Sequence, residues 1–297
     1  MSIAAASRAM PVRKEAPTPT HKRLSMTLAI LALMGFHQLA CGPAPYRAVE
    51  VANSCSLHLD GDDDFVDLGT VAAGSPLMLA GSPFTVSAWF RQESGGDPYQ
   101  RILDKSDGAV GRNGYALAAD PGEKRIHFYV HGGKTGGDFI SVRGAYEMGR
   151  WHHVAGVARQ GRLEIWVDGR RDGNASYESG SHALPADSAT TARLGTWNHE
   201  PGREFKGWLD EVAVWNTDLS GAAIQAIYAA RGRGDLSRNW GPYDYSGTLV
   251  GWWRMETGAE SASVLFVADA SGKNDPGRLM PTPGSGAGPI LDCKSVP

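Results

Sequence analysis

The sequence predicts an all-β fold, an antiparallel β-sandwich with one short helix late in the chain. Two observations lead to this prediction: short runs alternate between apolar and polar residues, and turn residues separate these runs. A third is the composition, with 38 Gly, nine Trp, nine Tyr and eight Phe among 297 residues. Hydrophobic residues make up 42%, so a chain of this length can fold around a core without help from a metal or a disulfide.

Each predicted strand is a short run that places its apolar side chains on one face. In residues 84–91, for example, the apolar side chains at the even positions share a face, as the two-residue period of a strand requires. In 163–167, Leu163, Ile165 and Val167 do the same, and Asp168-Gly169 then closes a turn. The predicted strands, in order, are 57–59, 65–68, 84–91, 125–130, 151–158, 163–167, 193–195, 205–215 and 249–255.

One helix is predicted between the last two of these strands. Ser220 is a good N-cap, and Gly232 is a good terminating residue because glycine adopts positive φ without steric strain. Between them, Ala223, Ile224 and Ile227 begin an apolar stripe with helical spacing.

The first 40 residues are predicted to be a signal peptide. Lys22 and Arg23 precede the apolar run 26–36, which is too short to cross a bilayer, since a spanning helix needs about 20 residues. The long basic stretch before this run leaves open that translation starts at Met10 instead of Met1.

The residues after the apolar run resemble the lipobox of bacterial lipoproteins. Residues 39–42 read LACG, although Gln38 stands where an aliphatic residue is usual. The resemblance implies that Cys41 is acylated and that the protein is exported and held to a membrane by lipid. Cleavage further along, which would leave Cys41 an ordinary thiol in a secreted protein, is the alternative.

The other two cysteines are expected to pair. With Cys41 acylated, Cys55 and Cys293 are left as an even pair in an oxidising compartment, near the two ends of the predicted sandwich. We therefore divide the mature chain into a tether at 41–53, a folded domain at 54–280 and a C-terminal tail at 281–297.

Net charge argues against a nucleic-acid partner. The formal charge of the whole chain is −3, and the first 40 residues hold five Lys or Arg against one Glu, so the remainder is more acidic still. A protein that binds nucleic acid needs a basic surface to neutralise phosphates.

Several segments, taken in order, resemble the laminin-G-like jelly-roll domains of the concanavalin A-like superfamily. The segments are 57–66, 84–91, 151–155 with 165–169, 206–216, and 249–255 with 269–274. The resemblance implies a jelly-roll sandwich. It does not fix the function, because this fold is used by lectins, glycosidases, adhesion modules and structural domains.

An acidic loop suggests a calcium site. Asp60, Asp62, Asp63 and Asp64 lie within five positions, and carboxylates are the ligands that Ca²⁺ prefers. The resemblance implies a calcium ion in this region, with Asp210 brought close by a neighbouring strand. We expect Asp60, Asp64 and Asp210 to be the ligands. The alternative is that Asp60 and Asp64 cap a turn and the others face water.

No pair of residues predicts catalysis. Glycosidases that retain configuration need two carboxylates about 5.5 Å apart. Glu164 and Asp168 share a face, but Asp168 lies in a turn. Asp210 and Glu211 are adjacent on a strand, so their side chains point to opposite faces. We expect the chain not to be an enzyme.

Two predicted loops carry aromatic residues that could stack on a sugar. They are Trp197, with Asn198 and His199 beside it, and Tyr99. The alternative is that these rings pack loops onto the sandwich. The sequence thus predicts a cell-surface or outer-membrane module that binds a glycan or a surface protein. A purely structural envelope domain is the second possibility, and a glycoside hydrolase-like enzyme is the third.

Overall fold

The computed structural model is an antiparallel β-sandwich with one α-helix, which confirms the predicted fold class. It describes residues 48–79, 81–107, 113–132, 140–172, 177–178, 189–199, 201–257, 266–280 and 288–297. The predicted signal peptide, Cys41 and the first part of the tether lie outside these residues. Among the described residues, no helix is long and apolar enough to cross a membrane.

The strands account for most of the described chain. In order they are β1 (Ser56–Asp60), β2 (Phe65–Val71), β3 (Phe84–Gln92), β4 (Gln100–Ser106), β5 (Asn113–Asp120), β6 (Arg125–Gly132), β7 (Ile140–Ala145), β8 (His152–Arg159), β9 (Arg162–Val167), β10 (Arg170–Arg171), β11 (Tyr177–Glu178), β12 (Thr190–Leu194), β13 (Lys206–Trp215), β14 (Leu249–Thr257), β15 (Phe266–Asp269), β16 (Gly277–Met280) and β17 (Ile290–Asp292). The α-helix is α1 (Gly221–Ala229), and a 3₁₀ turn, η1, covers Ser246–Thr248. The sequence did not predict β4, β5 and β7, nor the short strands β10, β11, β15, β16 and β17.

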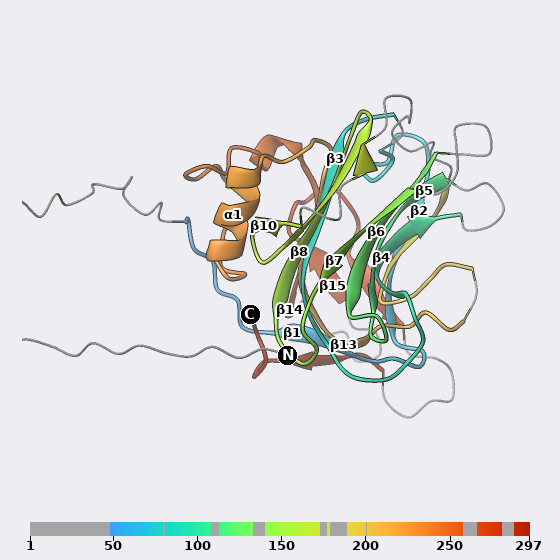
Figure 1. Ribbon diagram of the computed structural model, residues 1–297. Helices are drawn as coiled ribbons and strands as arrows, with labels where there is room; N and C mark the ends of the chain where they lie inside the picture. The colour runs from blue at the N-terminus through green and yellow to red at the C-terminus, as the bar shows by residue number, and fades with distance from the viewer. Residues whose placement is uncertain are drawn as a thin grey trace, which may run out of the picture. The chain divides into compact units, whose positions relative to one another are not determined.

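Strand pairing arranges the sandwich in two layers. The first runs β17–β1–β13–β3–β8–β9, with β14 paired to the far half of β13. The second runs β16–β2–β12–β4–β5–β6–β7. Strands β14, β15 and β16 connect the two layers by successive antiparallel pairs (Figure 1).

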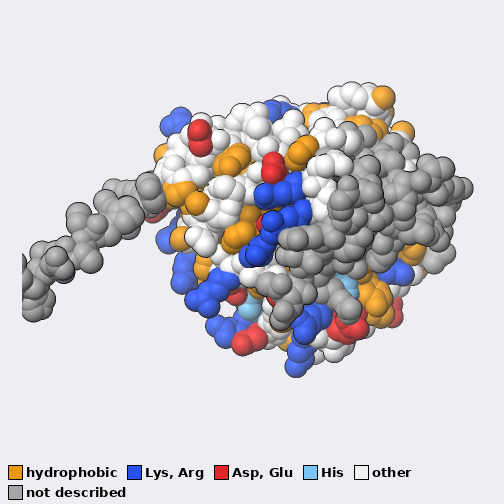
Figure 2. Space-filling model, turned by 45° about the horizontal axis from the view of Figure 1, so that its top comes forward, with side chains coloured by type: hydrophobic (Ala, Val, Ile, Leu, Met, Phe, Trp, Pro, Cys, Tyr) orange, Lys and Arg blue, Asp and Glu red, His pale blue; other side chains and the backbone are white. Residues whose placement is uncertain are grey.

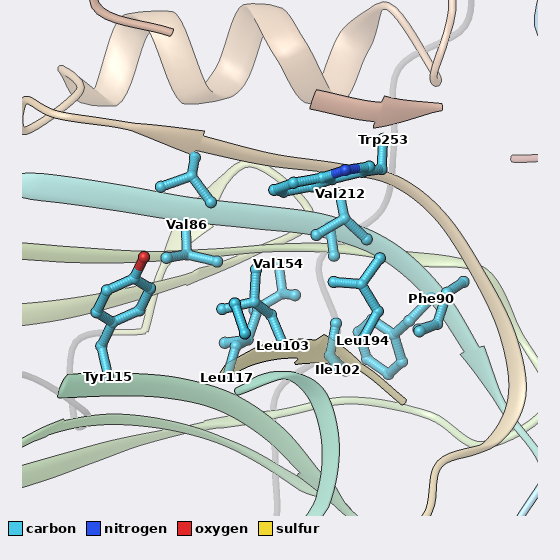
Figure 3. Packing of buried hydrophobic residues seen from close by; sticks show 14 of the residues in the cluster. Val86, Phe90, Ile102, Leu103, Tyr115, Leu117, Val154, Leu194, Val212 and Trp253 are labelled. Atoms are coloured by element: carbon cyan, nitrogen blue, oxygen red, sulfur yellow. The ribbon is translucent and has the colours of Figure 1, made fainter. Parts of the chain in front are cut away.

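The main core fills the space between the layers. Val86 and Val154 of the first layer face Leu103 and Leu117 of the second (Figure 3). Packing is close enough to dictate residue size: a Cβ on Gly156 of β8 would lie 2.4 Å from the ring of Phe128.

A second apolar cluster covers the outer face of the first layer. Side chains from β8 and β13 pack there against α1 and the segment that follows it. Figure 1 shows α1 on the outer side of β8. The Ser220 hydroxyl accepts a hydrogen bond from the backbone N–H of Ala223 at 3.2 Å, so the predicted N-cap is present. The helix ends at Ala229, a little before the predicted Gly232, whose φ of 70° lies in the turn beyond. The central part of the first layer is therefore buried on both faces.

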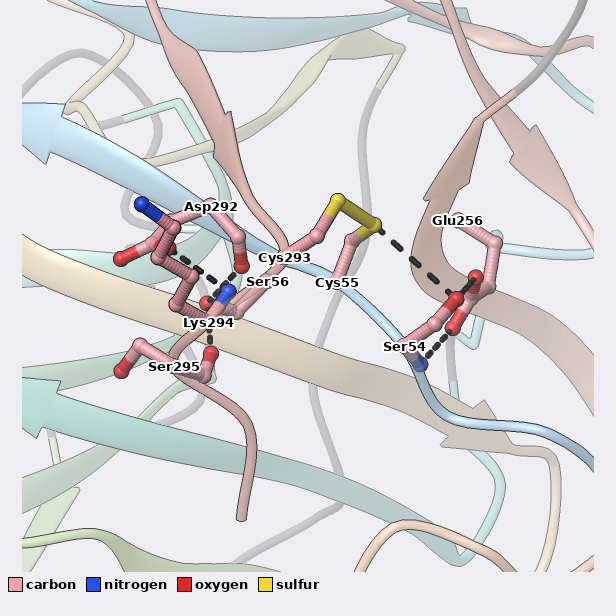
Figure 4. Close-up of a disulfide and its surroundings, with 8 residues drawn as sticks. All are labelled: Ser54, Cys55, Ser56, Glu256, Asp292, Cys293, Lys294 and Ser295. Atoms are coloured by element: carbon pink, nitrogen blue, oxygen red, sulfur yellow. Dashed lines mark hydrogen bonds between the residues drawn. A yellow bond between two sulfur atoms is a disulfide. The ribbon is translucent and has the colours of Figure 1, made fainter.

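The two ends of the folded chain are joined as the sequence predicts. Cys55 and Cys293 form a disulfide beside the antiparallel pair of β1 and β17 (Figure 4). On the other side of Cys55, the carboxylate of Glu256 accepts hydrogen bonds from the backbone N–H and the hydroxyl of Ser54, at 2.7 and 2.5 Å. These contacts attach the start of β1 to both β17 and β14.

Removing the disulfide should lower the melting temperature of the domain. The bridge closes a loop of 238 residues, and the loss of chain entropy in the unfolded state corresponds to roughly 5 kcal/mol as an upper figure. We expect a Cys55→Ser, Cys293→Ser variant to unfold at a markedly lower temperature in a calorimetric scan, whereas Cys41→Ser should match the wild type. A peptide mass map of the non-reduced protein with both thiols free would contradict the pairing.

Candidate functional site

Aromatic and arginine side chains gather on the outer side of the second layer. Ala116 and Ala118 of β5 form a small apolar cluster there with Tyr129 of β6, and Tyr99 packs against it. Because alternate residues of a strand point to the same face, His127 lies beside Tyr129. We call the group formed by Tyr99, His127, Tyr129 and Trp197, together with Arg101 and Arg203, the aromatic surface.

The rings of this surface hold one another in fixed orientations. His127 and Tyr129 are stacked, with their centroids 5.6 Å apart and their planes 10° apart. Tyr99, in the turn before β4, meets the His127 ring at 5.0 Å in an edge-on arrangement. Both ring geometries are favourable for pairs of aromatic side chains.

Two guanidinium groups connect the rings. That of Arg203 lies 4.4 Å from the centroid of Trp197 and 5.6 Å from that of Tyr99. That of Arg101 lies 5.1 Å from Tyr129 and 5.6 Å from Trp197. Cations over ring faces at these distances are attracted by the ring quadrupole.

Arg101 is anchored from below by a buried ion pair. Its Nε donates to Asp104 at 2.9 Å, and its Nη1 donates to the carbonyl of Tyr99 at 3.0 Å. Burial raises the pKa of Asp104, while the positive charge of Arg101 and hydrogen bonds from Ser106 act in the opposite direction. Strand β4 thus fixes the arginine, and the arginine fixes the turn that carries Tyr99.

The structure brings the four predicted sugar-contacting residues to this region. Tyr99, Trp197 and Asn198 are half-buried, and His199 is exposed. The His199 ring lies 5.8 Å from Trp197, and the Asn198 amide donates to the hydroxyl of Thr190 at 2.6 Å. Part of each predicted side chain therefore packs on the sandwich and part faces solvent.

Sequence reasoning missed the other members of the surface. The inward pattern of Ile126, Phe128 and Val130 already implied that His127 and Tyr129 point outward, so those two could have been found. Nothing in the local sequence marks Arg101 or Arg203, because their role depends on which loops meet.

The acidic loop between β1 and β2 forms a second candidate site. Asp60, Asp63 and Asp64 each offer a carboxylate oxygen, and these atoms lie within 4.8 Å of one another. Two of the predicted turn contacts are also present: Asp64 accepts from the N–H of Asp60 at 3.3 Å, and Asp60 accepts from that of Asp62 at 2.9 Å. Burial, followed by the charge of Asp60, raises the pKa of Asp64 to about 6.

Asp210 is not brought to this loop. Lys206, and not Asp210, is the register partner of Asp60 on β13. Asp210 lies further along the same strand, fully buried, and accepts a hydrogen bond from the amide of Asn53 at 2.9 Å. The structure therefore brings together the carboxylates of Asp60, Asp63 and Asp64, and the expected contribution of Asp210 to this group is wrong.

Two of the carboxylates weighed as catalytic groups have strong partners on the first layer. The Oε1 of Glu164 lies 2.8 Å from the Nε of Arg162 and 3.4 Å from the Nη1 of Arg171. Asp168 lies 2.7 Å from Nδ1 of His152.

A third carboxylate weighed for catalysis is deeply buried. Glu211 accepts hydrogen bonds from the indole of Trp252 at 2.6 Å and from Arg254 at 3.0 Å. Burial raises the pKa of Glu211 to about 8, against the opposing effect of Arg254.

Comparison with known proteins identifies the family. Residues 60–225 match the concanavalin A-like lectin/glucanases superfamily (Laminin_G_3), and the chain belongs to this family. The structure is similar to that of a candidate carbohydrate-binding protein from Bacteroides ovatus, with a TM-score of 0.56 and 16% identity over 82% of this chain. The match covers 60% of the Bacteroides ovatus chain. At this identity the similarity concerns the fold alone.

Two smaller carbohydrate-binding domains show a weaker similarity. One is the CBM40 of the IT-sialidase from Ruminococcus gnavus, at 14% identity and a TM-score of 0.48, covering 60% of this chain and 99% of that one. The other is domain 4 of the arabinanase AbnA from Geobacillus stearothermophilus, in complex with arabinotriose. It has 15% identity, a TM-score of 0.44, and coverage of 62% and 81%.

Proposed function

We propose that this chain is a non-catalytic glycan-binding module and that the aromatic surface is its binding site. The observation that carries the proposal is the pair of half-exposed rings, Tyr99 and Trp197, held in place by the guanidinium of Arg203. Membership of a lectin and glucanase superfamily supports this class of ligand.

The chemistry of the surface suits a sugar. A pyranose has an apolar face of C–H groups that stacks on an aromatic ring, and hydroxyls at its edge that need hydrogen-bond partners. Trp197 and Tyr99 offer the rings, and Asn198 and His199 offer polar groups beside them. Because the rings are already fixed by their neighbours, binding would order few side chains, which favours affinity.

Absence of catalysis is part of the proposal. The carboxylates of Glu164, Asp168 and Glu211 are each engaged by a charged or hydrogen-bonding neighbour. A surface protein is the alternative ligand, and a nucleic acid does not fit. On the face drawn in Figure 2, Lys and Arg side chains lie among Asp and Glu side chains, and the formal net charge of the chain is −3, which does not favour binding to phosphates.

Replacing Trp197 should abolish glycan binding. We expect the purified protein to bind selected oligosaccharides on a glycan array, and Trp197→Ala to lose these signals, because stacking area is lost at the centre of the surface. Tyr99→Ala should weaken binding at least tenfold in a calorimetric titration.

Trp208→Ala is the matched control. This half-buried Trp lies on β13 between His58 and Arg91, away from the aromatic surface, and should bind as the wild type does. All variants need melting temperatures that confirm folding at the assay temperature. An array with no hits, or full binding by folded Trp197→Ala, would favour the structural alternative, in which the rings only pack loops.

We also propose that the acidic loop binds calcium through Asp60, Asp63 and Asp64. One buried oxygen of Asp63 and one of Asp64 have no hydrogen-bond partner within the described part of the chain, which a cation would satisfy. Four neighbouring carboxylates also repel one another unless a positive charge offsets them.

Calcium should stabilise the protein more at pH 7 than at pH 5. With its pKa raised to about 6, Asp64 keeps its proton in the folded state at pH 5, and that proton must leave when calcium binds. Without calcium, the free energy of unfolding falls as pH rises from about 4 to about 6. The reason is that the unfolded chain loses this proton at a lower pH than the folded protein does.

The check is a set of thermal melts with excess calcium or excess chelator at both pH values. Asp60→Ala should remove the rise caused by calcium, whereas Asp62→Asn, outside the group of three, should retain it. Identical melting curves with calcium and with chelator would mean that these residues only cap the turn.

Finally, we propose that the chain is exported and anchored to a membrane by lipid on Cys41. The support is the LACG motif after the apolar run, together with the disulfide, which suits an oxidising compartment. Cys41→Ser should move the protein from the membrane fraction to the soluble fraction and abolish labelling by a fatty-acid analogue. A variant that still labels and sediments with membranes would contradict the anchor.

A further inference from the structure

A group of metal-binding side chains lies at the turn between β5 and β6, at the edge of the aromatic surface. Asp120 ends β5, Glu123 lies in the turn, and His127 lies on β6. Each offers one ligand atom, and the three atoms lie within 4.8 Å of one another. The register pairs Asp120 with Arg125, so Asp120 and His127 project from the same face of the hairpin.

The Asp120 carboxylate is oriented by the turn itself. Its Oδ1 accepts hydrogen bonds from the backbone N–H groups of Gly122 and Glu123, each at 2.9 Å. The residue is 3% exposed, so the carboxylate is fixed and largely removed from water before any ion arrives. Such pre-organisation favours metal binding because little order has to be gained.

The His127 ring is held equally firmly. It is 3% exposed, is nearly perpendicular to the ring of Tyr99 and stacks on the ring of Tyr129. Its Nε2 lies 3.8 Å from an oxygen of Glu123, which is too far for a hydrogen bond. Two ligands bound tetrahedrally to one zinc ion at 2.0–2.2 Å are about 3.4 Å apart, so the exposed Glu123 has to move only slightly to share an ion with His127.

The kind of ligands determines the metal. Calcium is bound by oxygen atoms, and magnesium usually keeps several water molecules. An imidazole together with two carboxylates is suited to zinc and neighbouring first-row metals. The acidic loop at Asp60–Asp64 offers only oxygen ligands and is therefore suited to calcium instead.

We propose that Asp120, Glu123 and His127 bind a zinc ion, with the remaining coordination position open to water or to a ligand. The ion would tie the β5–β6 turn to the ring on which Tyr99 packs, and so would support one edge of the aromatic surface. The proposal does not depend on glycan binding.

The test is zinc binding by the purified full chain, prepared without a polyhistidine tag. We expect one equivalent of zinc to bind in a calorimetric titration and to raise the melting temperature. Glu123→Gln should weaken the affinity at least tenfold without unfolding the protein, because this side chain is exposed. Cobalt in place of zinc should give a visible d–d absorption band that His127→Gln removes.

The structure offers a close control for this site. His58 lies 3.7 Å from a carboxylate oxygen of Glu93, almost the same separation as in the proposed site, but it belongs to no group of three ligands within the described residues. His58→Gln should bind zinc as the wild type does, and so should Asp60→Ala at the acidic loop. No saturable zinc binding at micromolar concentrations, or unchanged affinity in Glu123→Gln and His127→Gln, would overturn the proposal.

Discussion

Burial of both faces of the central strands of the first layer is the constraint on which the rest of this structure depends. Strand β3 is buried along almost its whole length, and β8 and β13 beside it are nearly so. A central sheet of this kind needs apolar partners on both sides, and here they are the second layer and the cluster around α1. The apolar face of the helix is therefore used to cover the first layer. The outer side of the second layer is left to carry the aromatic surface.

Residue size determines what that outer side can hold. Ala116 and Ala118 of β5 leave space above the sheet, and the rings of Tyr99 and Tyr129 occupy it. Arg101, paired with the buried Asp104, then brings a charge under the rings. Side chains that pack against one another in this way lose little freedom on binding, so the same contacts that stabilise the turn also prepare a surface for a ligand.

The sequence indicated the elements with clear periodicity and missed those without it. Alternation identified β3 and β6, and Ser220 marked the start of α1. Strand β4 could not be recognised, because its buried positions include Asp104 and Lys105, residue types that are rarely buried without a partner. Strand β5 is rich in small residues that carry no alternating signal.

The candidate sites divide in the same way. Residue type and position along the chain were enough to propose Trp197 and Tyr99 as sugar-contacting residues. The same information was enough to propose the disulfide between Cys55 and Cys293. Assigning Asp210 to the acidic loop required the register of β13 against β1, and the register places Lys206 there instead. Register depends on the pairing of whole strands, so no local pattern reveals it.

The central claim is that the aromatic surface, and no other part of the described structure, receives the ligand. It is tested most directly by following the indole N–H signals of the nine Trp residues by NMR during titration with an oligosaccharide that the protein binds on an array. Saturable movement of the Trp197 signal, with those of Trp208 and the buried Trp215 unchanged, is the predicted result. Movement of the Trp208 signal while that of Trp197 stays in place would contradict the account.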